Sequence, residues 1–127
     1  MERPPIQVEM HHATLSVADV RVSAEFYAAK LGFEIAFTEG EPPTFAGVNL
    51  DCVQIFLRRG QPAPQGCSVY FVISDADALH AWHRSNGVEV AQPPDDRPYG
   101  LRDYTVRDCD GYYLTFGHRT ASGMNSS

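Results

Sequence analysis

The segment Leu15-Ser16-Val17-Ala18-Asp19 recurs 56 residues later as Phe71-Val72-Ile73-Ser74-Asp75. Each copy places apolar residues at alternate positions and ends on an aspartate, which predicts a half-buried strand followed by the N-cap of a helix. Two more pairs of segments match in the same order, residues 32–36 with 87–91 and residues 49–52 with 108–111. Three matched segments in one order indicate an internal duplication.

In each half of this duplication, the residue pattern predicts a strand, a helix and three further strands. Glycines end the two helices, and a proline-rich connection (residues 41–43 and 92–94) precedes a two-stranded hairpin in each half. The helix residues expected in the core share helical spacing: Val22, Phe26 and Leu31, then Leu79, Trp82 and His83. The fold class predicted is α+β, with two βαβββ modules, helices on the outside, and curved mixed sheets that form a concave cleft.

The 127 residues suit one domain. We expect module one at about residues 8–60, module two at about 65–118, and a frayed polar tail at 119–127. Because the net charge is −6 and no basic stripe occurs, a nucleic-acid partner is not expected.

The chain carries no apolar run of the roughly 20 residues needed to cross a bilayer, so no membrane partner is expected either. Its first residues lack the apolar stretch of a signal peptide. The cysteines, Cys52, Cys67 and Cys109, are odd in number and lack metal-binding or redox spacing. These features predict reduced thiols and a cytoplasmic protein.

Two further stretches carry a family resemblance. Residues 12–19 with Phe26-Tyr27 and Leu31-Gly32-Phe33, and Tyr99-Gly100-Leu101-Arg102-Asp103-Tyr104 followed by residues 108–114, resemble the glyoxalase/bleomycin-resistance/dioxygenase superfamily, also called vicinal oxygen chelate proteins. The resemblance covers about residues 8–118 and is nearest to the bleomycin-resistance-like members. It implies paired βαβββ modules, a homodimer, and a small-molecule ligand on the concave sheet faces.

In the metal-using members of this superfamily, ligands lie on the first and last strands of the modules. The matching positions here hold His12, Phe56, Ser68 and Thr115. Only the histidine is a good ligand for zinc, nickel, manganese or iron, whereas a catalytic site generally takes three protein ligands. No metal and no other cofactor is therefore expected.

Strand alternation predicts which residues face the ligand: His12, Gln54, Phe56, Arg58, Ser68, Tyr70, Tyr113 and Thr115. Aromatic groups on this face suit a planar or hydrophobic ligand, although the same rings could fill the space between the sheets. Arg58 either holds a ligand carboxylate or phosphate or remains solvated. His12 either contacts the ligand or bonds a neighbouring backbone carbonyl.

The leading hypothesis is metal-free binding of a small organic molecule in an aromatic-lined cleft, for example to sequester a drug. One alternative is a metal-dependent glyoxalase-like lyase or dioxygenase. Another is an interaction module whose aromatic groups plug the cleft. Near the second hairpin, Arg102 and Asp103 are expected to pair or to meet a ligand, and Asp108 and Asp110 are expected to form a turn.

Overall fold

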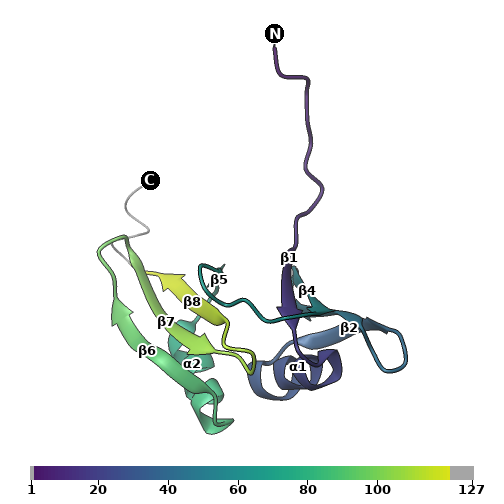
Figure 1. Cartoon of the computed structure of the whole chain (residues 1–127). Coiled ribbons are helices and arrows are strands. Elements are labelled where there is room, and N and C mark those ends of the chain that lie inside the picture. The colour runs from purple at the N-terminus through teal and green to yellow at the C-terminus, as the bar shows by residue number, and fades with distance from the viewer. Residues whose placement is uncertain (1, 121–127) are drawn as a thin grey trace.

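The computed structural model describes residues 2–120 and arranges them as two modules side by side (Figure 1). The first module contains β1 (Ala13–Val17), α1 (Val20–Phe26), η1 (Tyr27–Leu31), β2 (Glu34–Glu39), β3 (Phe45–Leu50) and β4 (Val53–Arg59). The second contains β5 (Ser68–Val72), α2 (Ala76–Ser85), β6 (Glu89–Asp96), β7 (Leu101–Arg107) and β8 (Tyr113–Arg119). Each module is thus a βαβββ unit.

The two sheets have the same topology. Their strand orders are β1-β4-β3-β2 and β5-β8-β7-β6, so each strand of the first module has the same position in its sheet as the corresponding strand of the second. The first strand of each module pairs in parallel with the last, and the other pairs are antiparallel. This arrangement confirms the α+β fold of two βαβββ modules.

Both helices begin where the repeated aspartates predicted. The side chain of Asp19 accepts the backbone N–H of Val22 at 3.1 Å, and that of Asp75 accepts the N–H of Ala78 at 3.0 Å. Each carboxylate therefore satisfies a backbone donor that has no partner within its helix. Gly32, with a φ of +90°, ends η1 in the left-handed conformation.

The predicted core face of the first helix is correct at Leu31 and Phe26 and wrong at Val22. The helix begins at Val20, and helical steps from there lead to Ala24, Tyr27 and Leu31, all of which are buried. Val22 falls on the other side and is 53% exposed. Trp82 of α2 was also wrongly expected in the core: it is 43% exposed and lies over Gly32, where an added Cβ would come within 3.0 Å of its ring.

The second proline-rich segment is not a connection. Pro93 and Pro94 lie inside β6, whose pairing with β7 shifts register on both sides of Gln92. A proline removes one hydrogen-bond donor from a ladder, and β6 tolerates the loss because it is the edge strand of its sheet. The first proline-rich segment does form the turn between β2 and β3.

A turn between β7 and β8 ties the modules together. Asp108 is buried and accepts the backbone N–H groups of Asp110 and Tyr112, both at 2.9 Å, as expected for a turn former. The other oxygen of its carboxylate accepts the hydroxyl of Tyr27 from the first module at 2.6 Å. Asp110 likewise accepts the hydroxyl of Ser23 at 2.5 Å.

A buried histidine makes a second bridge between the modules. Nε2 of His83 in α2 lies 3.0 Å from the backbone oxygen of Leu31, and its Nδ1 lies 2.9 Å from the hydroxyl of Tyr104. The carbonyl can only accept, so Nε2 carries the proton and Nδ1 accepts from the tyrosine. The side chains around these bridges form one continuous core, in which Phe33 meets Phe71 edge-on at 5.9 Å.

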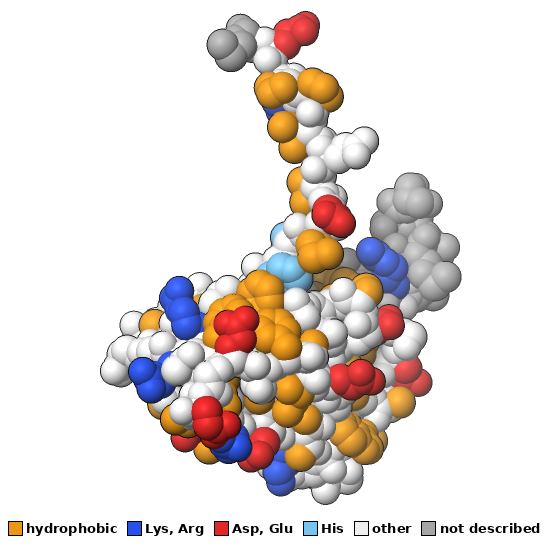
Figure 2. All heavy atoms as spheres, turned by 90° about the vertical axis from the view of Figure 1, so that its right-hand side faces the viewer, with side chains coloured by type: hydrophobic (Ala, Val, Ile, Leu, Met, Phe, Trp, Pro, Cys, Tyr) orange, Lys and Arg blue, Asp and Glu red, His pale blue; other side chains and the backbone are white. Residues whose placement is uncertain are grey.

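The chain before β1 extends away from both modules and carries exposed apolar side chains at alternate positions, namely Ile6, Val8 and Met10. Figure 2 shows this segment, with hydrophobic side chains gathered beside the histidines at its base. Within residues 2–120, no helix is long and apolar enough to cross a membrane. At the other end β8 reaches Arg119, and residues 121–127 of the predicted tail lie outside the described residues.

Candidate ligand-binding site

An aromatic cluster covers the face of the first sheet that α1 leaves open. Phe56 of β4 lies at its centre, with ring centroids 4.5 Å from His12, 5.2 Å from Phe45 and 6.1 Å from Phe37. Phe37 and Phe45 are 5.8 Å apart, which closes the group. All four side chains are half-buried, so a layer of rings remains accessible on this sheet. We call these four residues the aromatic platform.

A glycine makes room for the platform. Gly47 of β3 lies between Phe56 and Phe37 in register, and a Cβ added there would overlap the Phe37 ring. Because the glycine has no side chain, the ring lies low over the strand instead of standing up from it. The depth of the platform is therefore set by the backbone at Gly47.

We expect Gly47→Ala to displace the Phe37 ring and to lower the free energy of unfolding by about 1–3 kcal/mol, the usual cost of overpacking. Urea denaturation measures the loss. Adding Phe37→Leu to the alanine variant removes the overlapping ring atoms and should recover part of the stability. A double variant that is less stable than Gly47→Ala would contradict this account.

Polar groups border the platform. Nδ1 of His12 lies 3.3 Å from the backbone oxygen of Gln54, and its Nε2 lies 3.2 Å from Sδ of Met10. Gln54 donates one N–H of its side-chain amide to Oδ1 of Asn49 at 2.8 Å. Arg58 is exposed beside Ser16 and Phe45 in the register, and among the described residues its guanidinium makes no ion pair or hydrogen bond.

The other four predicted residues gather on the second sheet. Ser68 lies beside Tyr113, and Tyr70 lies beside Thr115, on the paired strands β5 and β8. The hydroxyls of Thr115 and Thr105 are bonded to each other at 2.8 Å. The guanidinium of Arg107 lies 5.7 Å from the centre of the Tyr113 ring, within the range of a cation–π contact.

The structure therefore divides the eight predicted residues into two groups of four, one at each sheet, with His12 directly before β1. Among residues 2–120 no hydrogen bond, ion pair or ring contact joins one group to the other. The shared core lies between the helix-covered faces of the two modules, where Phe33 meets Phe71, whereas the predicted ligand residues occupy the opposite faces.

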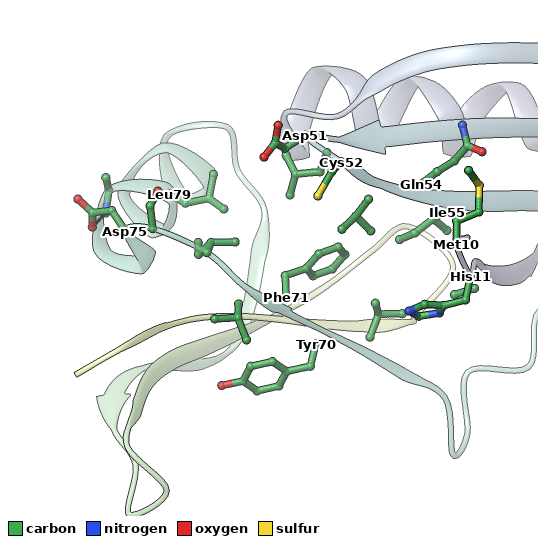
Figure 3. A pocket seen from close by; sticks show the side chains of 18 of the residues that line it. Met10, His11, Asp51, Cys52, Gln54, Ile55, Tyr70, Phe71, Asp75 and Leu79 are labelled. Atoms are coloured by element: carbon green, nitrogen blue, oxygen red, sulfur yellow. Dashed lines mark hydrogen bonds between the residues drawn. The ribbon is translucent and has the colours of Figure 1, made fainter. Parts of the chain in front are cut away.

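A cavity of about 1000 Å³ lies where the modules meet, between β5, α2, the β3–β4 turn and the residues before β1. Figure 3 shows Phe71, Cys52 and Leu79 around it, with Tyr70 on the side of β5 opposite to Phe71. Of the eight predicted residues, only Gln54 and Tyr70 contribute to its lining. The cavity and the open sheet faces are thus different surfaces.

The residues at the metal positions of the superfamily do not fit a metal ion. His12 and Phe56 are neighbours on the first sheet, whereas Ser68 and Thr115 lie on the second. Within the described part of the chain, no three His, Cys, Asp or Glu side chains are grouped closely enough to hold a metal. One histidine falls short of the three protein ligands that a catalytic metal site generally takes.

Sequence reasoning did not identify Phe37 and Phe45 as members of the platform. The pairing of β2 with β3 shifts register between Ile35 and Phe37, which breaks the two-residue alternation used to assign faces. Phe45 is the first residue of β3 and follows a turn, so too little alternation precedes it. Their ring contacts depend on strand pairing, which the local pattern does not specify.

The expected pair of Arg102 with Asp103 is not formed. Arg102 instead bonds Asp77 of α2 at 3.1 Å and Asp96 of β6 at 3.3 Å. Asp103 pairs with Arg97, whose Nε lies 2.7 Å from its carboxylate. The side chains of neighbouring residues on a strand point to opposite faces of the sheet, so Arg102 and Asp103 point away from each other and do not pair.

Comparison with known families gives one match that spans most of the chain. Residues 9–116 match the family described as the Glyoxalase/Bleomycin resistance protein/Dioxygenase superfamily. Among curated proteins, none matches the chain.

Several crystal structures share the fold. A member of the glyoxalase/bleomycin resistance protein/dioxygenase superfamily from Sphaerobacter thermophilus DSM 20745 is 25% identical, with a TM-score of 0.75 over 89% of this chain and 98% of that one. The bleomycin-binding protein of Streptomyces verticillus, complexed with copper(II)-bleomycin, is 27% identical, with a TM-score of 0.72 over 88% and 97%. TioX from Micromonospora sp. ML1 is 24% identical, with a TM-score of 0.76 over 86% and 97%, which is a likeness of fold.

Proposed function

Because the chain belongs to the Glyoxalase/Bleomycin resistance protein/Dioxygenase superfamily, whose fold carries both enzymes and binding proteins, we propose from its own residues that it is a binding protein. Its ligand is a small planar organic molecule, which the aromatic platform holds without a metal or other cofactor. Drug sequestration in the cytoplasm is the role that this activity would serve. The Streptomyces verticillus protein, described as bleomycin-binding, supports a ligand of this kind at 27% identity.

The single observation that carries the proposal is the aromatic platform. The three phenylalanine rings lie 5.2–6.1 Å from one another, the imidazole lies 4.5 Å from the ring of Phe56, and all four side chains remain partly exposed. Rings at such distances offer both apolar area and stacking geometry to a flat ligand. Arg58 at the edge, free of an ion pair among the described residues, can add a contact to an acceptor on the ligand.

We also propose that two copies of the chain form the complete cleft. Within one chain the two groups of predicted ligand residues lie on different sheets and do not meet. A homodimer that sets the first sheet of one copy against the second sheet of the other would enclose a ligand between them. Twofold symmetry would then produce two equal clefts.

The test is calorimetric titration of the untagged protein with 2-methylquinoline, a flat neutral probe. Phe56→Leu removes the central ring and keeps an apolar side chain, so we expect about fivefold weaker binding, equivalent to ~1 kcal/mol. Phe26→Leu is the matched control, because Phe26 is a partly buried residue of α1 outside the platform. We expect it to leave the affinity unchanged.

Two results would contradict the proposal. The first is equal weakening by Phe56→Leu and Phe26→Leu, which would show that the platform has no special part in binding. The second is loss of binding when a chelator is added, which would restore the metal-dependent lyase or dioxygenase hypothesis. Analytical ultracentrifugation of the same samples tests the dimer, whose absence would remove the two-copy cleft.

A further inference from the structure

A buried carboxylate lies beneath two exposed tyrosines on the open face of the second sheet. Asp103 of β7 is 2% exposed. One of its carboxylate oxygens accepts the hydroxyl of Tyr70 at 2.7 Å and that of Tyr99 at 2.6 Å, and the other accepts Nε of Arg97 at 2.7 Å. The rings of Tyr70 and Tyr99 remain accessible, since these residues are 44% and 60% exposed.

The two tyrosines reach this carboxylate from different parts of the chain. Tyr70 lies on β5, and Tyr99 lies in the turn between β6 and β7. Tyr70 passes over β8 at Gly117, where an added Cβ would lie 2.7 Å from its hydroxyl and 2.9 Å from Cβ of Asp103. The missing side chain at Gly117 thus allows the contact, much as Gly47 allows the packing of Phe37.

These bonds fix the direction of both hydroxyl protons. A phenol has one proton to donate, and each tyrosine gives it to Asp103. What each oxygen presents to a ligand is therefore its lone pairs, next to an accessible ring. These two hydroxyls consequently offer a ligand acceptors and no donor.

The charge states favour this arrangement at neutral pH. Burial alone would raise the pKa of Asp103, but the hydrogen bonds from Tyr99, Tyr70 and Arg97 together lower it, so the carboxylate is ionised. The pKa of Tyr99 is raised mainly by its hydrogen bond to Asp103 and then by burial. The pKa of Tyr70 is raised mainly by burial and then by its hydrogen bond to the same carboxylate. Both phenols thus keep their protons.

We propose that Tyr70 and Tyr99 form a selectivity site for planar ligands that carry N–H donors, and that Asp103 acts as its positioning residue. This inference rests on the proposed function, because it concerns the second half of the same cleft. The ligand class is an aromatic or heteroaromatic amine, amide or amidine, whose N–H groups meet the phenol oxygens. Asp103 itself does not touch the ligand, since its oxygens are already bonded and buried.

The test compares 2-aminoquinoline with 2-methylquinoline at pH 8.5, where both are largely neutral. An amino and a methyl group have similar sizes, so the difference in affinity reports the N–H donors. We expect wild-type protein to bind the amino compound about tenfold more tightly, because the methyl compound leaves acceptors without a partner. Equal affinities would overturn the inference while the platform binding stands, and failure of both probes to bind would overturn both.

Asp103→Asn tests the positioning role. Nε of Arg97 can only donate, so the carboxamide keeps its oxygen toward Arg97 and turns its donating NH₂ toward the two tyrosines. The tyrosines then accept from this NH₂ and are free to turn their own protons toward the ligand. We expect the preference for the amino compound to fall from about tenfold to about twofold, with the affinity for 2-methylquinoline retained. A preserved tenfold preference in a folded Asp103→Asn protein would overturn the assignment.

Two further variants distinguish the orientation of the tyrosine protons from the loss of a negative charge and from a failure to fold. Asp95→Asn makes the same change at the register partner of Asp103, an exposed carboxylate that bonds neither tyrosine, and should keep the tenfold preference. If Asp103→Asn fails to fold, Tyr99→Phe in the exposed turn takes its place and should roughly halve the preference. A spectrophotometric titration at 295 nm gives a ligand-free check: Asp103→Asn should ionise tyrosines at lower pH than wild type, and an unchanged curve would count against the inference.

Discussion

Replacing Asp108 with alanine is expected to lower the free energy of unfolding by about 3 kcal/mol, and the melting temperature by roughly 10 °C. The substitution removes the acceptor for the hydroxyl of Tyr27 and for two backbone N–H groups. Tyr27 is fully buried, so no water replaces the lost partner. Urea denaturation followed by circular dichroism measures the change.

Asparagine at the same position separates the lost acceptor from the lost charge. Asp108→Asn keeps one oxygen for the backbone N–H groups, and burial already raises the pKa of the Asp108 carboxyl, which means that its ionised form is costly here. We therefore expect asparagine to cost less than alanine, about 1 kcal/mol. Asp95→Ala, at an exposed position, should change stability by less than about 0.5 kcal/mol. Equal losses at positions 95 and 108 would contradict this role for the turn.

Acidification from pH 8 to pH 5 is expected to destabilise the protein through His83. Burial lowers the pKa of His83, the bond to the Leu31 carbonyl opposes the shift, and nearby His80 adds to it. Below the unfolded-state pKa of about 6.5, the unfolded chain takes up a proton that the folded chain does not. Stability from this group is thus complete above about pH 7 and decreases as the pH falls, by up to ~1.4 kcal/mol per pH unit.

Urea denaturation at several pH values, in wild type and His83→Gln, measures this dependence. The variant should be less stable at pH 8, because the bonds to Leu31 and Tyr104 change, but its stability should fall less steeply below pH 7. Burial and Arg84 also lower the pKa of His80, so that residue contributes to the slope in both proteins. His11→Gln, at an exposed position, should retain the wild-type slope. Parallel curves for wild type and His83→Gln would exclude His83 as the source.

The duplication, the fold class and both helix starts could be predicted because they depend on local pattern. Asp19 and Asp75 cap helices through bonds that span three residues, which the sequence displays directly. The exposure of Trp82 could not be predicted, since it depends on Gly32 of the other module. His83 was expected in the core from its spacing and is there, but its partner Leu31 is 52 residues away.

The site was predictable to the extent that it follows strand alternation. That alternation separates Phe56 from its buried neighbours Ile55 and Leu57, and it selects Tyr70 next to buried Phe71. It could not reveal that a carboxylate beneath Tyr70 comes from β7, nor that Gly117 leaves space for the contact. Those facts depend on which strands are neighbours, and the order β5-β8-β7-β6 is a property of the folded chain.

Two of the hydrogen-bonded bridges between the modules come from one position of the duplicated helix. Tyr27 and His83 are 56 residues apart, the same interval that separates Leu15 from Phe71. Both are completely buried, and each bonds a residue of the opposite module, Asp108 or Leu31. A single module cut from the chain would therefore leave a buried polar group without its partner and an open apolar side. The repeat that is so evident in the sequence is accordingly half of a cooperative unit, and we expect neither half to fold alone.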